Sequence, residues 1–356
     1  MILFILLIYM YNIFIPGRVC LFGEHTDWVG GMRNLNRDLK KGICIVSGTD
    51  IGVYANVKYQ EDKLTYIKNN NVFEIPIEEN ILKKYSSEGG YYSYICGVLL
   101  FMKKKYNISG MYINNYKNTI IEGKGLSTSA AICVLIAKSI NLCYNLKLSD
   151  KDIMNIAYQG EILTPSRCGR MDQCVALGKG PFKIIFDGDN IDIFKIKVKK
   201  TIYMIIVELG GFKDTKTILQ NLQKSFPFPK DQNDKKLEYL FGEYNINVIN
   251  DAISYIENGD IDKLGFLMTR AQSNFDKYTI PLYPDQFTSP LLHELLNCQV
   301  ILPHIFGGKG VGSQGDGSAQ LICKSNDSRE NVLSIINKKY PNMTCNKLTI
   351  DANNLT

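Results

Sequence analysis

The stretch Glu122–Ala131, which reads Glu-Gly-Lys-Gly-Leu-Ser-Thr-Ser-Ala-Ala, constrains the fold of this chain more than any other. A strand-like apolar pair precedes it, and an apolar run with helical character, Ile132–Leu146, follows it. Two glycines and three hydroxyl residues therefore lie where a turn enters a helix. Glycines let the backbone approach a ligand, and the first helical N–H groups have no partners within the helix. This arrangement favours an anion site.

An ordinary serine-capped helix after a glycine turn would explain the same stretch, so both interpretations stay open at this point. The stretch is not a P-loop, because Gly123-Lys124 is followed by Gly125-Leu126 and not by serine or threonine. A phosphate bound here would therefore be bound by a loop of another type.

Length and composition indicate a globular protein with two domains. The chain has 356 residues, of which 45% are apolar and 21% charged, which is enough to build two cores. Charged residues become more frequent near residues 190–200, which predicts domains over residues 1–195 and 196–356. The net charge of +6 is mild and dispersed, so we expect no nucleic-acid partner.

The cysteines and the N-terminal segment bear on compartment and membrane. The ten cysteines form no Cys-x-x-Cys pair, and the chain has only three histidines, so we do not expect a zinc site. We expect the cysteines to be free thiols in a reducing cytoplasm. Met1–Ile15 is strongly apolar but short for a membrane span, which needs about 20 residues. We expect a buried first strand and no membrane association; a signal segment and a misplaced gene start remain alternatives.

A second polar cluster lies in Gly23–Gly31, which follows two predicted short strands separated by Pro16-Gly17. Glu24, His25 and Asp27 could bind a metal, act as acid and base, or hold the hydroxyls of a polyol. A plain polar loop with a Gly-Gly turn is the alternative.

Three further stretches present chemistry or constrain packing. Pro165 and Gly169 mark a loop that displays Asp172, which could also cap a helix. Gly307–Gly317 runs late in the chain into a predicted strand, so we expect a tight glycine turn supporting a ligand site and not a dinucleotide fingerprint. A helix predicted over Asp262–Asp276 is expected to break at Gly265.

Four stretches, in this order, resemble motifs of the GHMP small-molecule kinases. Pro16–Gly31 resembles the galactokinase signature, and Gly123–Ala131 is similar to the superfamily's phosphate loop with Thr128 for its middle serine. Cys168–Gln173 resembles the galactokinase string Cys-Gly-x-Met-Asp-Gln, and Gly307–Gly317 is similar to the third glycine-rich motif. The resemblance implies a two-domain α+β fold, the GHMP kinase fold, with the active site in the cleft between the domains.

The resemblance also implies ATP-dependent phosphorylation of a sugar hydroxyl, with the anomeric hydroxyl of galactose or a related sugar as the acceptor. Asp172 would be the catalytic carboxylate and would also contact the substrate, and Arg18 would be its cationic partner. Sugar hydroxyls would be held by Glu24, His25 and Asp27. The ATP phosphates would be lined by Gly123, Gly125, Ser127, Thr128 and Ser129, and Mg²⁺ would be held by Ser129 and Glu161.

The chain departs from galactokinases in places that concern the sugar. The segment Met32–Thr49 is longer and more polar than the usual link, Arg170 stands beside Asp172 where galactokinases have an apolar residue, and Asp214–Leu222 occupies the region of their Tyr- and Arg-rich helix. Two alternatives therefore stay open: a GHMP kinase for a non-sugar alcohol such as mevalonate or homoserine, and a catalytically silent sensor of sugar and ATP. We expect a monomer or a homodimer.

Overall fold

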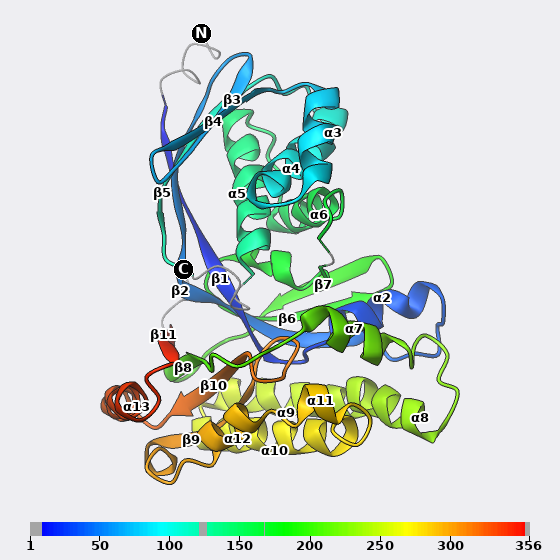
Figure 1. Cartoon of the computed structure of the whole chain (residues 1–356), viewed down its shortest axis with the longest axis vertical. Helices are drawn as coiled ribbons and strands as arrows, with labels where there is room; N and C mark the ends of the chain where they lie inside the picture. Colours follow the sequence, from blue (N-terminus) through cyan, green and yellow to red (C-terminus); the bar gives the residue numbers. More distant parts are fainter. Residues whose placement is uncertain (1–8, 121–126, 167, 353–356) are drawn as a thin grey trace. The chain divides into compact units, whose positions relative to one another are not determined.

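The computed structural model describes residues 9–120, 127–166 and 168–352. The chain has a mixed α/β fold that forms two compact units, and neither unit is one continuous segment (Figure 1). Unit 1 contains residues up to Arg18 and Gly48–Gly178, and unit 2 contains Val19–Ser47 and the chain from Lys179 onward. Strands β1 (Tyr11–Phe22) and β2 (Gly42–Tyr59) each belong partly to both units, and the predicted boundary at 195/196 falls inside unit 2.

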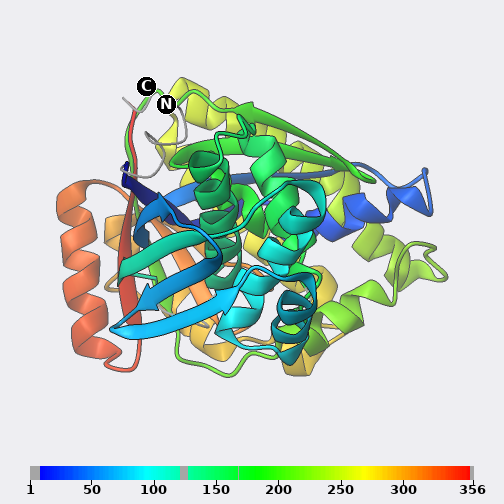
Figure 2. The same ribbon diagram turned by 90° about the horizontal axis from the view of Figure 1, so that it is seen from above.

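The strands of the first sheet follow the order β4-β3-β5-β2-β6-β7, with β1 paired to β2. In unit 1, β3 (Lys63–Lys68) is antiparallel to β4 (Asn71–Pro76) and parallel to β5 (Met111–Asn118). Four helices gather beside these strands (Figure 1 and Figure 2). They are α3 (Glu79–Glu88), α4 (Tyr91–Lys105), α5 (Thr128–Cys143) and α6 (Asp150–Glu161).

Helices α5 and α6 carry the polar groups of unit 1, and their sequences explain their positions. Most of α5 from Ala130 onward is buried, as expected for a helix that is apolar on every side. Helix α6 begins with a capping box, since Ser149 Oγ accepts from Asp152 N–H and Asp152 Oδ2 accepts from Ser149 N–H at 3.0 Å. Near its other end, Gly160 packs so closely on α4 that a Cβ there would lie 2.5 Å from the Cα of Val98. This contact holds the end of α6, where Glu161 lies.

Unit 2 is built on an antiparallel sheet in the order β11-β8-β10-β9. Its strands are β8 (Ile202–Glu208), β9 (Ile305–Gly310), β10 (Ser318–Cys323) and β11 (Thr344–Ile350). Side chains from β8, β9, β10, α12 (Pro290–Leu296) and α13 (Asn326–Lys339) form one core, which includes Ile205, Leu295, Leu321 and Ile336.

A second core in unit 2 is rich in aromatic side chains. It includes Val29, Phe226, Phe241, Phe275 and Phe287. These residues come from α2 (Thr26–Gly31), α10 (Ile261–Thr279), α11 (Pro284–Phe287) and the helical region near α7 (Thr215–Gln223) and α8 (Gln232–Tyr239). Helix α9 (Asn245–Asn258) and the hairpin of β6 (Gly180–Asp187) and β7 (Asn190–Lys195) complete the unit.

Two local expectations were wrong. Helix α10 is continuous through Gly265, because that glycine lies where the helix crosses β9 and a Cβ there would come within 2.4 Å of the Cβ of Phe306. Packing thus outweighs the poor helix propensity of glycine. Strand β1 is a single strand through Pro16-Gly17, since the fixed φ of proline suits extended backbone.

Two observations concern the thiols and the membrane question. All ten cysteines are free, and eight of them are buried. In the part of the chain that the structure describes, none of the helices has both the length and the apolar character required to cross a membrane.

Candidate active site

Arg18 and Asp172 form an ion pair in unit 1, although 154 residues separate them in the sequence. Arg18 lies on β1, and Asp172 is the first residue of the short 3₁₀ helix Asp172–Leu177. The guanidinium donates to Oδ1 of the carboxylate; 7% of the Arg18 side chain is exposed and 28% of that of Asp172. The carboxylate therefore has a fixed cationic partner and still presents part of its surface to a ligand.

Glu161 lies beside this pair at the end of α6 and is completely buried. Its carboxylate accepts from Ser166 Oγ at 3.2 Å and from Gln173 Nε2 at 2.9 Å. Burial raises the pKa of Glu161, a hydrogen bond from the Ser129 side chain acts against this, and the charge of Asp172 adds to the increase. The hydroxyl of Ser129 and the carboxylate of Glu161, which were both predicted to hold magnesium, are thus brought together.

Gln173 was not predicted as a site residue, although its side chain contacts Glu161. It is fully buried and lies next to Asp172 in the chain. The signal was its place in the Asp172-Gln173 string, but nothing in the sequence pairs it with the end of α6.

The predicted phosphate loop is described only in part. Gly123 and Gly125 lie outside the described residues. Ser127 precedes α5 in the left-handed region, with φ of 59°, and its Oγ is buried without a hydrogen-bond partner among the described residues. Thr128 and Ser129 form the first turn of α5. The buried Ser127 hydroxyl and the unpaired first N–H groups of a helix suit a phosphate.

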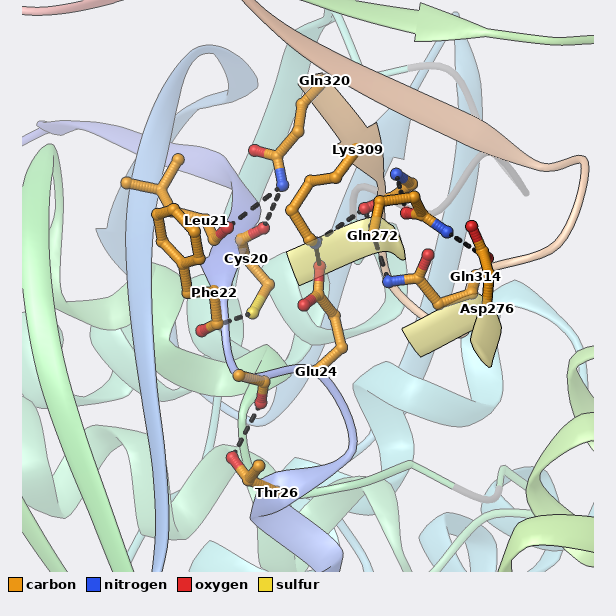
Figure 3. A network of polar contacts seen from close by, with 12 residues as sticks. Cys20, Leu21, Phe22, Glu24, Thr26, Gln272, Asp276, Lys309, Gln314 and Gln320 are labelled. Atoms are coloured by element: carbon orange, nitrogen blue, oxygen red, sulfur yellow. Dashed lines mark hydrogen bonds and ion pairs between the residues drawn. The ribbon is translucent and has the colours of Figure 1, made fainter. Parts of the chain in front are cut away.

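In unit 2, Glu24 has a cationic partner that was not predicted. The Nζ of Lys309, on β9, donates to Oε1 of Glu24 and to the carbonyl of Gly310 (Figure 3). Only 4% of the Lys309 side chain and 7% of the Glu24 side chain are exposed. The only sign in the sequence was a lysine placed between glycines.

His25 is enclosed by aromatic rings and cannot act as a cation near neutral pH. Its ring centroid lies 5.5 Å from that of Phe241, and the Trp28 indole N–H donates to Nδ1 over 3.3 Å. Burial, followed by the charges of Lys213 and Lys309, lowers the pKa of His25 to about 3. Since Nδ1 accepts a hydrogen bond, the proton of the neutral ring lies on Nε2.

Asp27, the third predicted sugar contact, is buried on α2, two residues after His25. One sequence-based alternative made Glu24, His25 and Asp27 a metal site. In the described ranges, no group of three or more histidine, cysteine, aspartate or glutamate side chains is placed to hold a metal ion.

The polar segment after Gly31 is anchored inside unit 2. Asp187, at the end of β6, accepts from Arg33 at 2.7 Å and lies within 3.1 Å of Arg37 and 3.0 Å of Lys41. Hydrogen bonds from Arg33 and Lys41 lower the pKa of Asp187 to about 2. The extra charges of this segment therefore hold a surface loop together.

Comparison with known proteins relates the chain to the GHMP kinases. Residues 93–180 match the family described as GHMP kinases N terminal domain. The chain is 31% identical to a galactokinase of Clostridium beijerinckii over 199 residues, which is 54% of this chain and 48% of that protein. It is 24% identical to a galactokinase of Fusobacterium nucleatum over 370 residues, which cover 93% and 90% of the two chains. The chain thus spans about half the length of the first of these relatives.

Solved structures show the same fold. The crystal structure of Lactococcus lactis galactokinase complexed with galactose has a TM-score of 0.71 at 17% identity, covering 96% of this chain and 94% of that one. Methanococcus jannaschii mevalonate kinase has a TM-score of 0.72 at 21% identity, covering 95% and 98%. The predicted fold is confirmed, and the prediction that the active site lies in a cleft between domains stays a prediction. Residues 93–180 thus match the GHMP kinase N-terminal domain, galactokinases are among the relatives of the chain, and its fold is that of galactokinase and mevalonate kinase structures.

Proposed function

We propose that the protein transfers the γ-phosphoryl group of ATP to a sugar hydroxyl, with the anomeric (C1) hydroxyl of galactose or a related sugar as the acceptor. The observation that carries this proposal is the Arg18–Asp172 pair, in which a partly exposed carboxylate is held by a buried guanidinium. Phosphoryl transfer depends on positioning and on stabilising charge, and this pair can do both.

Asp172 would orient the attacking hydroxyl and take its proton as the bond to phosphorus forms. A carboxylate is a weak base for a sugar hydroxyl, so the proton moves late, when the forming bond has made that oxygen acidic. Arg18 would keep Asp172 ionised and steady the charge on the transferring group, because arginine stays protonated at any relevant pH.

The groups at the start of α5 suit the nucleotide phosphates and their metal ion. Gly123, Gly125, Ser127, Thr128 and Ser129 would line the phosphates. Ser129 and Glu161 would hold Mg²⁺, and the hydrogen bond between them supports this, since a hydroxyl and a carboxylate are the hard oxygen ligands that magnesium prefers. When bound, the ion would neutralise charge on the β- and γ-phosphates.

Replacing Ser129 by alanine should raise the magnesium concentration needed for half-maximal turnover. One oxygen ligand is lost while Glu161 remains. The measurement is a magnesium titration of ADP release at saturating ATP, with the exposed Ser87→Ala on α3 as the control. An unchanged titration would remove Ser129 from the metal site.

Glu24, His25 and Asp27 would form the acceptor site in unit 2. Replacing Asp27 by alanine should raise the KM for the sugar while the KM for ATP stays nearly unchanged, because a carboxylate accepts hydrogen bonds from sugar hydroxyls. Steady-state kinetics with each substrate varied in turn measures this, with the exposed Asp38→Ala as the control. If ATP binding failed first, the acceptor site would lie elsewhere.

A carboxylate-bearing alcohol, as in mevalonate or homoserine, is the second candidate acceptor. The observation in its favour is that two ammonium groups, those of Lys213 and Lys309, act on His25, and a substrate carboxylate needs such cations. A silent sensor of sugar and ATP is the third candidate; it would bind both ligands without turnover. Cytoplasmic location and a monomeric or homodimeric state remain predictions from the sequence.

The experiment that decides among these candidates measures ADP release from Mg-ATP with a panel of free sugars, mevalonate and homoserine, using Asp172→Asn as the control. Sugar-dependent turnover that vanishes in the control supports the proposal. Turnover with mevalonate or homoserine alone selects the second candidate. Thermal stabilisation by ATP and a sugar without any turnover selects the sensor.

A further inference from the structure

Lys309 is held in place from both of its neighbours in the chain. It lies on β9, the edge strand of the unit 2 sheet. The N–H of Gly308 donates to Thr269 Oγ1 at 3.3 Å, and the N–H of Gly310 donates to Gln272 Oε1 at 2.7 Å. Both acceptors lie on α10, so this helix covers the open edge of the strand. The backbone on either side of Lys309 is therefore fixed.

The network continues along α10. Gln272 Nε2 donates to Asp276 Oδ1 at 2.8 Å, which fixes the amide that accepts from Gly310 (Figure 3). The ammonium of Lys309 thus reaches Glu24 from a base with little freedom to move. A buried charge without its partner is costly. The Glu24 carboxylate is therefore most stable in the position where it contacts the ammonium of Lys309.

Three polar atoms around this pair retain capacity for a ligand. Lys309 Nζ uses two of its three protons, on Glu24 and on Gly310. In the described ranges, Glu24 accepts a hydrogen bond from Lys309 through Oε1, and Oε2 accepts none. Gln314 is 2% exposed, and its Oε1 is buried without a hydrogen-bond partner in the described ranges.

These atoms match the hydrogen-bonding pattern of a hydroxyl group. A hydroxyl donates one hydrogen bond and accepts others, so it can donate to Glu24 Oε2 or Gln314 Oε1 and accept from Lys309. The Gln314 oxygen lies over Gly310, where a Cβ would come within 2.2 Å of it. A substrate carboxylate, by contrast, would have to compete with Glu24 for the ammonium.

We propose that Lys309 is a positioning residue of the acceptor site, which holds Glu24 so that its second oxygen binds a hydroxyl of an uncharged, polyhydroxylated acceptor. This inference rests on the proposed function and names the class of substrate. Glu24 binds the substrate hydroxyl, and Lys309 acts through Glu24 and can also donate its third proton to that hydroxyl.

Replacing Lys309 by methionine tests this. The KM for the sugar should rise roughly 10- to 100-fold, the range for a lost charge-assisted hydrogen bond, and the KM for ATP should change less than about 2-fold, since no ATP contact is removed. A control is Lys347→Met, which breaks an exposed ion pair with Glu330 in the same unit. That variant should leave both KM values unchanged.

The pH profile separates positioning from a merely structural role. Without the ammonium, burial favours the uncharged form of a carboxyl group, and a protonated carboxyl is a weaker acceptor of a hydroxyl hydrogen bond than a carboxylate. In Lys309→Met, kcat/KM for the sugar should therefore fall as the pH is lowered from 8 to 6, relative to the natural chain. The other titratable groups of this region are His25 and Asp27 beside Glu24, Lys213, and Asp276 on α10; His25 stays neutral across this range. The double variant Glu24→Gln/Lys309→Met should lose this extra pH dependence.

Two further variants test the inference if Lys309→Met does not fold. The double variant leaves neither charge of this buried pair, so it should fold and show the raised sugar KM. Lys309→Arg keeps the charge and should retain a sugar KM closer to that of the natural chain than to that of the double variant. Unchanged sugar KM in folded Lys309→Met, or equal loss in Lys309→Arg and the double variant, would overturn the inference.

Failure of the proposed function gives a different result. If the natural chain turns over no acceptor, the proposed function is wrong, and titration calorimetry with the same sugars then decides the inference. Sugar binding by the natural chain that is weakened at least about 10-fold in the double variant would support it. Equal binding by both proteins, or no binding by either, would overturn it.

Discussion

Asp172→Asn is expected to lower kcat by at least roughly 100-fold, the usual scale for a lost general base, with the affinity for ATP nearly unchanged. The amide has almost the shape of the carboxylate and can still accept from Arg18. It cannot take the proton of the attacking hydroxyl, and it leaves the positive charge of Arg18 without its anionic partner. The measurement is single-turnover ADP formation at saturating Mg-ATP and sugar.

The control for this variant is Asp192→Asn on β7, an exposed aspartate of the same chemistry. Both variants should show thermal unfolding similar to that of the natural chain, so that lost turnover is not lost fold. Near-normal kcat in Asp172→Asn would show that this carboxylate takes no part in the chemistry. Arg18 and Asp172 would then be a structural pair.

Acid should destabilise unit 2 through His25. The pKa of this side chain is about 3 in the folded protein, mainly because of burial, against 6.5 in the unfolded chain. As the pH falls below 6.5 the unfolded chain binds the proton first, so the free energy of unfolding falls with pH until about 3. The full loss is on the order of 5 kcal/mol. This contribution is fully present above pH 6.5.

The His25→Gln variant measures this contribution. Glutamine can still accept from the Trp28 indole N–H but does not titrate, so the free energy of unfolding should depend less on pH between 6.5 and 3. Urea unfolding at several pH values gives the slope, and His304→Gln is the control. Glu161 has a raised pKa and acts in the opposite direction from about pH 4.5 upward, so the comparison must be between variants. Equal pH slopes in His25→Gln and the natural chain would refute the prediction.

Short-range patterns in the sequence were sufficient for much of the fold. The apolar run after Ser129 predicted α5, because a helical pattern of apolar residues depends on neighbours in the chain. Gly265 shows the limit of such reasoning. Its effect depends on the strand that the helix crosses, and no local pattern contains that information.

The candidate site divides in the same way. The resemblance to known motifs singled out Arg18 and Asp172, and the structure places them in contact. Gln173 and Lys309 were missed as site residues because their partners, Glu161 and Glu24, lie 12 and 285 residues away. Side chains at such separations meet only when the backbone between them has taken its tertiary path.

The sequence by itself determined which residue types are present and which segments become helices, strands and glycine turns, because these depend on covalent geometry and local contacts. Only the tertiary structure decided the electrostatic state of the groups. It paired the Glu24 carboxylate with the Lys309 ammonium, enclosed His25 among aromatic rings and buried Glu161 beside Ser129. The physical reason is that burial and the distance between charges set the energy of an ionised group, and both are properties of the packed fold.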